Sequence, residues 1–247
     1  MLRRMGKKSK IAEKILLYFP EHDIYIELFF GAGGMFFNKP KARYNIVNDF
    51  DNDVFNLYIT AKKKTGTLVT EVKDMPVSES LFKYWLKNKE DEQVLKAVRF
   101  LFLSNFSLYG TGATLAVHPA NNTKTILLQD IKPTAKLLDN TTILNCDFRD
   151  VLRKISAKSL RDKNRAFVYA DPPYLSTCNN YNTPNWTFND SADLIELLVD
   201  SKYRFAISEF DNADIVKLAR QYDLNVNIIG ERRAIKTRRT EILITNY

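Results

Sequence analysis

Short apolar runs alternate along the chain with longer segments in which apolar residues recur at helical spacing. The short runs are rich in β-branched and aromatic residues, which is typical of buried strands. They predict strands at residues 24–29, 44–47, 141–146, 165–170 and 203–208. The longer segments predict helices near residues 11–19, 54–61, 149–155, 194–198 and 215–219. We expect Asp190 or Ser191 to cap the fourth of these helices.

The alternation of strands and helices predicts an α/β protein whose sheet has helices on both faces. Two final β-type runs, at residues 225–230 and 241–245, predict a hairpin that adds antiparallel strands to the sheet. Between residues 66 and 134 the alternation stops, and the spacing predicts helices at 81–85 and 94–102. A loop-like stretch follows from residue 104. We therefore expect residues 66–134 to be an inserted, mainly helical subdomain, and residues 1–65 with 135–247 to form the main domain.

The segment Asp171-Pro172-Pro173-Tyr174 directly follows the predicted strand at 165–170. Two successive prolines exclude helical and strand hydrogen bonding. We therefore expect a stiff loop at the carboxyl end of a strand, where open α/β sheets bind ligands. The Asp171 carboxylate and a proline carbonyl are acceptors, and Tyr174 has a flat aromatic face, which together suit a planar ring with an exocyclic amino group. Taken alone, the four residues are equally compatible with a proline turn that has an incidental tyrosine.

Glycines follow the first predicted strand, in the segment Gly31-Ala32-Gly33-Gly34. Glycine lets the backbone turn tightly and approach a ligand closely. The spacing departs from the dinucleotide-binding fingerprint, which argues against a nucleotide-dependent oxidoreductase. Asp49 ends the second predicted strand, where a carboxylate can bind ribose hydroxyls. Alternatively, Asp49 or Asp51 caps the next helix.

Basic residues outnumber acidic ones by 37 to 29, which gives a formal net charge of +8. A basic surplus favours a polyanionic partner without identifying it. Five of the eight residues at 232–239 are basic. They can form a solvated loop, but beside a cleft they would contact phosphates. The two cysteines, Cys146 and Cys178, indicate neither a disulfide framework nor a metal cluster, which fits a reducing cytoplasm.

The order and spacing of these motifs resemble those of the Dam-type DNA adenine-N6 methyltransferases. A Phe-x-Gly-x-Gly stretch at residues 29–33 precedes Asp-Pro-Pro-Tyr by more than a hundred residues. Residues 6–10 resemble the family's N-terminal Gly-Gly-Lys segment, with Lys8 at the lysine position, and residues 145–148 resemble its Asp-Phe element. Residues 207–211 and 239–247 resemble two of its strands. The match covers both ends of the chain and is weak in the middle, where residues 105–110 only loosely follow the family pattern.

The resemblance implies a class I, Rossmann-like methyltransferase fold with a seven-stranded mixed sheet, in which residues 66–134 are the target-recognition subdomain. It implies methyl transfer from S-adenosylmethionine to adenine N6 in double-stranded DNA, by flipping the base out of the duplex. The implied catalytic residues are Asp171, Pro172, Pro173 and Tyr174. The implied cofactor-binding residues are Lys8, Glu27, Phe29, Gly31, Gly33, Asp49, Asp147, Phe148 and Asp171. The expected nucleic-acid contacts are Arg4, Lys7, Asn105, Tyr109, Tyr181, Arg232, Arg233, Lys236 and Arg238, and no metal is expected.

Alternatives remain open for single residues and for the activity. Glu27 can be a sheet-edge or capping carboxylate, and Asp147 can cap the helix after it. The acceptor loop suits any planar amino group, so RNA adenine and cytosine N4 are alternative substrates. A catalytically silent DNA-binding relative is a third alternative, which the intact Asp171–Tyr174 loop opposes. We further expect a monomeric cytoplasmic protein with no membrane segment, and a cognate restriction endonuclease as a candidate partner.

Overall fold

The structure, a computed structural model, describes residues 1–2, 8, 11–108, 114–116, 122–155, 165–175, 184–233 and 238–247. A sheet of seven strands lies at its centre, in the order β3-β2-β1-β4-β5-β7-β6. The strands are β1 (Ile24–Glu27), β2 (Tyr44–Asn48), β3 (Thr141–Leu144), β4 (Ala166–Ala170), β5 (Arg204–Phe210), β6 (Asn225–Arg233) and β7 (Arg238–Thr245). The first five are parallel, and β7 runs antiparallel between β5 and β6. This mixed sheet confirms the predicted class I methyltransferase fold and the C-terminal hairpin.

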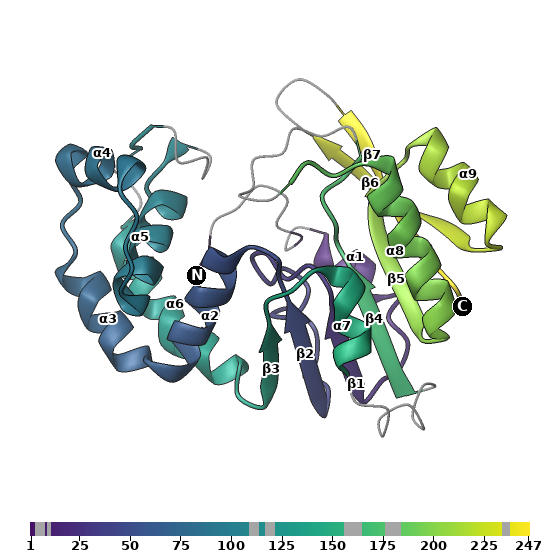
Figure 1. Cartoon of the computed structure of the whole chain (residues 1–247), viewed down its shortest axis with the longest axis horizontal. Coiled ribbons are helices and arrows are strands. Elements are labelled where there is room, and N and C mark those ends of the chain that lie inside the picture. The colour runs from purple at the N-terminus through teal and green to yellow at the C-terminus, as the bar shows by residue number, and fades with distance from the viewer. Residues whose placement is uncertain are drawn as a thin grey trace.

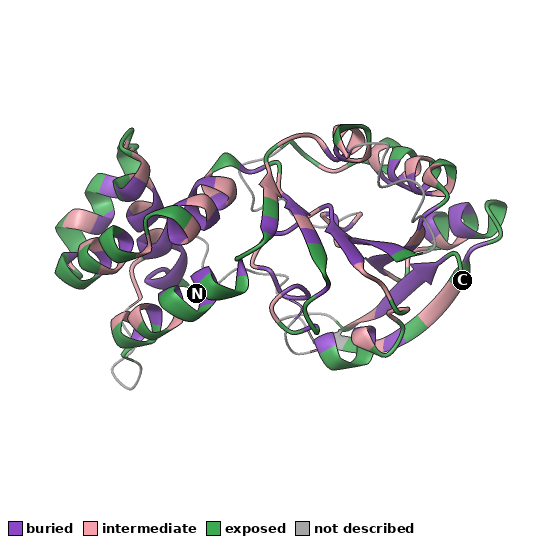
Figure 2. Ribbon diagram, turned by 90° about the horizontal axis from the view of Figure 1, so that it is seen from below, coloured by how far each residue is buried: buried purple, intermediate pink, exposed green. Residues whose placement is uncertain are grey.

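Helices cover both faces of the sheet, as the alternating pattern predicted (Figure 1). They are α1 (Ala12–Leu16), α2 (Asn52–Lys63), α7 (Phe148–Lys154), α8 (Phe188–Ser201) and α9 (Ala213–Gln221). Successive side chains of a strand point to opposite faces. Ile24 and Ile26 of β1 accordingly pack with residues of α7, α8 and α9, whereas Tyr25 packs with residues of α1 and α2. Figure 2 shows the buried residues on the strands and on the inner faces of these helices.

The remaining helices form a second hydrophobic core beside the sheet (Figure 1). They are α3 (Thr65–Asp74), α4 (Glu79–Lys87), α5 (Gln93–Asn105) and α6 (Thr123–Leu137). Only α4 and α5 were predicted. No helix was expected at α3, whose first residues, Thr65-Gly66-Thr67, are weak helix formers. In the structure α3 begins there, and its Leu68 and Val72 are fully buried in the helical core, which outweighs the local propensity.

The helical part does not begin and end between helices, because its two boundaries with the main domain fall within α2 and α6. Leu57 and Ala61 of α2 belong to its core, although α2 lies before residue 66. Helix α6, which contains Pro133, runs through residue 134. Two long helices therefore connect the sheet to the helical part.

The predicted cap of α8 is wrong. Thr187 is the N-cap: its hydroxyl accepts a hydrogen bond from the Asp190 amide at 3.3 Å, and the Asp190 carboxylate accepts one from the Thr187 amide at 2.8 Å. This reciprocal capping box satisfies two amides at once, and it places Asp190 in the first turn of the helix.

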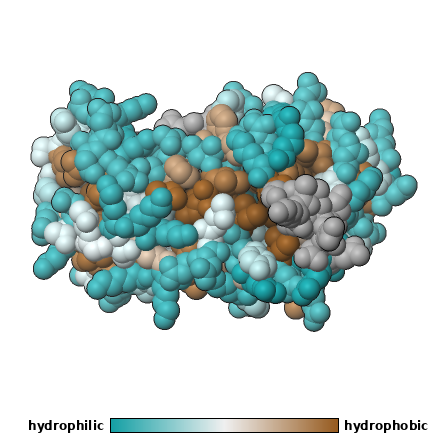
Figure 3. Space-filling view, turned by 60° about the horizontal axis from the view of Figure 1, so that its bottom comes forward, coloured by the Kyte–Doolittle hydropathy of each residue, from teal (hydrophilic) through white to brown (hydrophobic). Residues whose placement is uncertain are grey.

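Hydrophilic side chains cover most of the face drawn in Figure 3, and hydrophobic ones gather across its middle. None of the helices in the described part of the chain is long and apolar enough to cross a membrane.

Candidate active site

The carboxyl ends of the parallel strands bring the predicted motifs to one edge of the sheet. Glu27 of β1 pairs with Val47 of β2 and with Tyr169 of β4, and Asn48 pairs with Leu144 of β3. The segments that follow these residues are therefore neighbours. They are the glycine turn after β1, Asp49 after β2, residues 145–148 after β3 and the Asp171–Tyr174 loop after β4.

Asn48 joins three of these strand ends, a role that sequence reasoning missed. Its side-chain amide donates to the Leu28 carbonyl at 3.1 Å and to the Cys146 carbonyl at 3.0 Å. Its carbonyl oxygen accepts from the Cys146 amide at 3.1 Å. A buried asparagine just before an acidic residue was the available signal, but its partners are about a hundred and twenty positions apart in the sequence.

Asp49 is bound to the glycine turn. The Gly31 amide donates to one carboxylate oxygen of Asp49 at 2.6 Å, and the Asp51 amide donates to the other at 2.9 Å. Of the two expected candidates for the cap of α2, Asp51 is the cap, because its carboxylate accepts from the Asp53 amide at 2.9 Å. Asp49 is half-buried beside the turn, where a ribose-binding carboxylate was predicted.

The three glycines of the turn have different surroundings. Gly31 has a φ of +49°, and a Cβ there would meet no atom within 4 Å. Gly33 has a φ of +65°, and a Cβ there would lie 2.3 Å from the Phe37 ring, so its small size is needed for packing. A Cβ on Gly34 would lie 2.7 Å from the Lys8 amide nitrogen. Gly34, which sequence reasoning did not single out, therefore allows the Lys8 segment to lie against the turn.

Three aromatic rings meet next to the glycine turn. Phe29 lies 5.4 Å from Phe148 and 5.4 Å from Trp186 between ring centroids, and Phe148 lies 5.5 Å from Trp186. Phe148 is buried, whereas Phe29 and Trp186 are partly exposed. Trp186 comes from the segment before α8 and was not among the predicted cofactor residues. It completes an apolar wall of which sequence reasoning found two members.

Asp147 caps α7 and belongs to a charged cluster. Its carboxylate accepts from the Arg149 amide at 2.9 Å, which is the capping role that was left open. The Arg149 guanidinium binds Asp190 and Asp193 of α8, each at 2.7 Å, and lies 3.3 Å from Asp147. Although partial burial opposes its charge, bonds to these carboxylates raise the pKa of Arg149 above its usual value. The cluster joins the amino-terminal parts of α7 and α8.

These surroundings fit an adenosyl group. The space next to Gly31 is open, Asp49 and Asp147 offer carboxylate acceptors, and Phe29 with Phe148 offers apolar faces. A nucleoside requires polar partners for its hydroxyls and apolar partners for its base, and both are present at the same sheet edge.

Asp171 forms a partly buried ion pair with Lys8. The Lys8 ammonium lies 2.5 Å from an oxygen of the Asp171 carboxylate, and Lys8 is only 2% exposed. Pro172 is buried and Pro173 is partly exposed. The ammonium of Lys8, which is a predicted cofactor contact, thus lies at the Asp171–Tyr174 loop.

Tyr174 is held on several sides. Its hydroxyl donates to the buried carboxylate of Glu241, and its ring contacts the edge of the Phe210 ring at a centroid distance of 4.5 Å. The Lys8 ammonium lies 4.5 Å from the centroid of the Tyr174 ring. Glu209 accepts a hydrogen bond from the Leu175 amide at 3.3 Å. Burial, more than the nearby carboxylates, raises the pKa of Tyr174 well above its ordinary value.

Glu27 lies inside the sheet near this loop. It is 2% exposed and accepts a hydrogen bond from the Tyr25 hydroxyl at 2.8 Å. Burial raises the pKa of Glu27 to about 8, although the bond from Tyr25 and the charge of Lys39 oppose the rise. Burial in turn lowers the pKa of Lys39 to about 8. Glu27 is thus a fully enclosed carboxyl.

The sequence matches the model of the D12 class N6 adenine-specific DNA methyltransferases over residues 5–235. The chain belongs to this family. A DNA adenine methylase from Serratia marcescens is 27% identical over 85% of this chain and 83% of its own. A DNA adenine methylase from Vibrio cholerae is 24% identical over 95% and 88%, and a type II methyltransferase, M1.LlaDCHI, from Lactococcus lactis is 22% identical over 98% and 93%. Family membership confirms the expected DNA adenine methyltransferase.

Among solved structures, an rRNA methyltransferase from Streptomyces viridochromogenes is 14% identical over 95% of this chain and 82% of its own, with a TM-score of 0.42. This similarity is too distant to support an inference about the fold or the function of this chain.

The structure describes only some of the residues that were predicted to contact DNA. Arg4, Lys7, Tyr109, Tyr181 and Lys236 lie outside the described residues. Asn105 is buried in the last turn of α5, where its side-chain amide donates to the Leu101 carbonyl at 2.9 Å, so the structure gives it a structural role.

The basic hairpin of the methyltransferase gathers four arginines at its end. The register of β6 and β7 pairs Arg232 with Arg239 and Arg233 with Arg238. Arg238 is exposed and lies 3.5 Å from the equally exposed Glu231. The four arginines therefore lie on paired strands, and phosphate contact by the basic residues at 232–239 stays a prediction.

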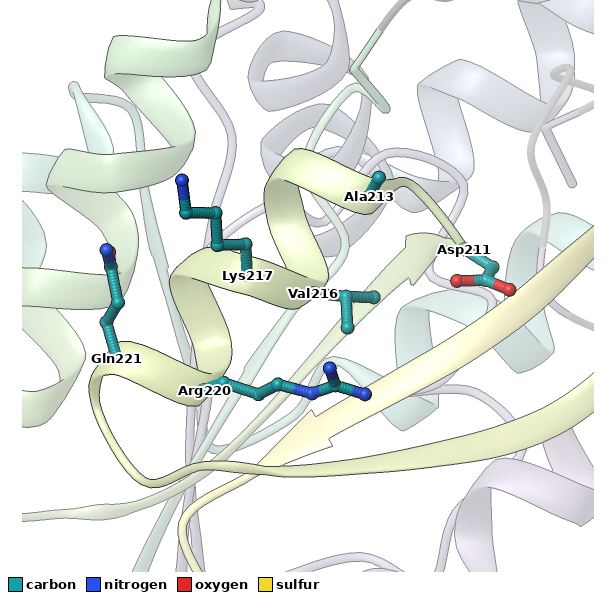
Figure 4. Close-up of a pocket in the computed structure, with 6 residues that line it drawn as sticks. All are labelled: Asp211, Ala213, Val216, Lys217, Arg220 and Gln221. Atoms are coloured by element: carbon teal, nitrogen blue, oxygen red, sulfur yellow. The ribbon is translucent and has the colours of Figure 1, made fainter.

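A surface pocket of the methyltransferase lies along α9 (Figure 4). Asp211, Ala213, Val216, Lys217, Arg220 and Gln221 line it. Its side chains include both signs of charge, and none of them was predicted to take part in the reaction.

Proposed function

We propose that this methyltransferase transfers the methyl group of S-adenosylmethionine to N6 of an adenine flipped out of duplex DNA, and that the Asp171–Tyr174 loop accepts the base. The observation that supports this proposal is the position of the loop. It follows β4 at the same sheet edge as the Gly31 turn and Asp49, so a base and a nucleoside cofactor can meet there. Family membership supports DNA adenine as the substrate.

The cofactor would be held by the residues after β1, β2 and β3. The Gly31 turn supplies space, the Asp49 carboxylate suits the ribose hydroxyls, and Phe29 with Phe148 suits the adenine ring. Glu27 and Lys8 are two further predicted cofactor contacts, and both lie close to the Asp171–Tyr174 loop. When bound, S-adenosylmethionine supplies an electrophilic methyl group.

The loop would align the amino group of the target base. The Asp171 carboxylate and the Pro172 carbonyl accept its two hydrogens, which fixes the direction of the nitrogen lone pair, and such alignment supplies much of the acceleration. The amine becomes acidic only as its new bond forms. A carboxylate paired with Lys8, such as Asp171, is therefore basic enough to take the proton and pass it to water.

Tyr174 would stack on the flipped ring. Flipping costs a few kcal/mol of unpairing, and stacking on an aromatic side chain offsets part of this cost. Tyr174 is 8% exposed, so a neighbouring group must move to admit the base. The Lys8 ammonium above the ring is one such group.

DNA recognition would involve the helical part and the basic hairpin. The helices α3 to α6 form a separate core beside the sheet, which suits an inserted target-recognition subdomain. The arginines at the end of the β6–β7 hairpin would neutralise phosphates, which predicts binding that weakens with salt. A monomeric state and a cognate restriction endonuclease stay predictions.

The test is transfer of a labelled methyl group from S-adenosylmethionine to unmethylated duplex DNA, with RNA of matched sequence alongside. N6-methyladenine in DNA, identified by mass spectrometry, is the expected product. Asp171→Ala should abolish the transfer and leave cofactor binding, measured by equilibrium dialysis, largely intact. Label in RNA or on cytosine would overturn the proposed acceptor, and loss of cofactor binding in Asp171→Ala would overturn the role of Asp171.

A further inference from the structure

One buried side chain of the last strand reaches the catalytic loop. Glu241 lies in β7, where it pairs with Phe210 of β5 and with Gly230 of β6. Its side chain is 1% exposed. The Tyr174 hydroxyl donates to Oε1 of Glu241, and the Lys8 ammonium lies 3.4 Å from the same oxygen. One oxygen of the Glu241 carboxylate thus contacts both Tyr174 and Lys8, and Lys8 in turn contacts Asp171.

The Tyr174 hydroxyl is not needed for stacking, because a base stacks on the aromatic face alone. Burying a carboxylate is costly unless charged and hydrogen-bonding partners surround it. Glu241 has such partners in Lys8 and Tyr174, and it constrains both of them in return. The Tyr174 ring is held at its hydroxyl by Glu241 and along its side by Phe210, which fixes the plane of the ring.

Lys8 has two carboxylates within reach. Its ammonium lies 2.5 Å from Asp171 and 3.4 Å from Glu241. If the amino group of a base binds Asp171, it competes with Lys8 for that carboxylate. Glu241 then remains within reach of the buried ammonium and can hold it.

We propose that Glu241 is a positioning residue for the target base, which sets the plane of the Tyr174 ring and holds the Lys8 ammonium when the base occupies Asp171. Glu241 touches neither the base nor the methyl donor and acts through these two side chains. This inference rests on the proposed acceptor role of the Asp171–Tyr174 loop. It adds a residue from the antiparallel end of the sheet to a site built from the parallel strands.

The first test is a double-mutant cycle between Glu241→Gln and Tyr174→Phe. The first change keeps the size of the side chain and removes its charge, and the second keeps the ring and removes the hydroxyl. Because a small misplacement near reacting groups lowers the rate by up to about 100-fold, we expect each single variant to lower kcat by about 10- to 100-fold. The double variant should be no slower than the slower single variant, since the two changes break one contact.

Cofactor affinity and a matched control separate positioning from general damage. Equilibrium dialysis should give a dissociation constant for S-adenosylmethionine within about twofold of the wild type in both single variants, because their losses lie in the catalytic step. Glu196→Gln, which changes an exposed glutamate on α8, should leave kcat unchanged. If the loss of kcat in the double variant equalled the product of the losses in the two single variants, the proposal would be overturned. If Glu241→Gln does not fold, Tyr174→Phe with unchanged kcat would overturn it.

A measurement without substrate tests the contacts directly. The Lys8 ammonium lies 4.5 Å from the Tyr174 ring centroid, so the ring current should shift its NMR resonance in protein labelled with ¹⁵N-lysine. Glu241→Gln should move this resonance and Glu196→Gln should not. An unmoved Lys8 resonance would overturn the proposal. If the wild type transferred no methyl group, the proposed function would fail, and this spectrum would still decide whether Glu241 holds Lys8.

Discussion

The Lys8 ammonium and the Asp171 carboxylate lie 2.5 Å apart, although 163 positions separate the two residues in the sequence. Lys8 precedes the first strand, and Asp171 follows the fourth. The pair ties the amino-terminal segment to the Asp171–Tyr174 loop. Gly34 permits this contact because any larger residue there would meet the Lys8 backbone. The charged centre of the loop is thus assembled from residues that are far apart in the sequence.

Replacing Lys8 by methionine should destabilise the fold. Removing one partner of a buried ion pair typically costs about 3–5 kcal/mol, because the other charge is left without a partner. Here two carboxylates, Asp171 and Glu241, lose the same ammonium. Urea denaturation of Lys8→Met should therefore show a loss of a few kcal/mol in the free energy of unfolding.

The matched control is Lys83→Met on α4. Lys83 lies 3.4 Å from Glu79, but both side chains are more than 60% exposed. Such a pair contributes about 0.5 kcal/mol or less, so the control should be close to the wild type. Equal losses in the two variants would contradict the structural role given to Lys8.

Alanine at Gly31 should weaken cofactor binding more than it weakens the fold. The new Cβ would meet no protein atom, and the positive φ costs about 1 kcal/mol. The methyl group would enter the space proposed for the cofactor. Equilibrium dialysis with labelled S-adenosylmethionine and a melting curve would separate the two effects. Wild-type affinity in Gly31→Ala would show that the cofactor lies elsewhere.

Trp186 should report cofactor binding by its fluorescence. The chain has two tryptophans, and Trp85 lies in the core of the helical part. Trp186 contacts Phe29 and Phe148, so its emission should change when S-adenosylmethionine binds. The change should persist in Trp85→Phe and disappear in Trp186→Phe. A signal that followed Trp85 instead would argue against a cofactor site at the aromatic wall.

Glu209 should make stability depend on pH. Burial raises the pKa of Glu209 to about 8, from an ordinary value of 4.5. A carboxyl whose pKa is raised on folding stabilises the fold below its unfolded pKa, and this contribution is lost as the pH rises through the folded pKa. Relative to Glu209→Gln, the wild type should therefore lose stability between about pH 5 and pH 8, on the order of a few kcal/mol.

Urea denaturation across this pH range would measure the difference. Glu13→Gln, which changes an exposed glutamate on α1, should follow the wild type at every pH. A constant difference between the wild type and Glu209→Gln would show that Glu209 is ionised in the folded protein near neutral pH.

Much of the sheet could be predicted because its signals are local. The run before Asp171 is apolar and β-rich, and the prolines at 172 and 173 end the strand whatever surrounds them. The alternation along β1 likewise follows from the period of a strand. The helical part was predicted less well, because α3 begins with weak helix formers and is stabilised by burial of Leu68 and Val72.

By itself, the sequence determined the α/β class, the positions of the strands and the two loops at which the chemistry was expected. It also pointed to Asp171, Gly31 and Asp49 from local pattern and family resemblance. Only the tertiary structure placed Lys8 on Asp171, Glu241 on Tyr174 and Trp186 on Phe148. These contacts join residues far apart in the sequence, and their formation depends on strand order and register. Local periodicity specifies which residues are buried, but it does not specify which of them meet.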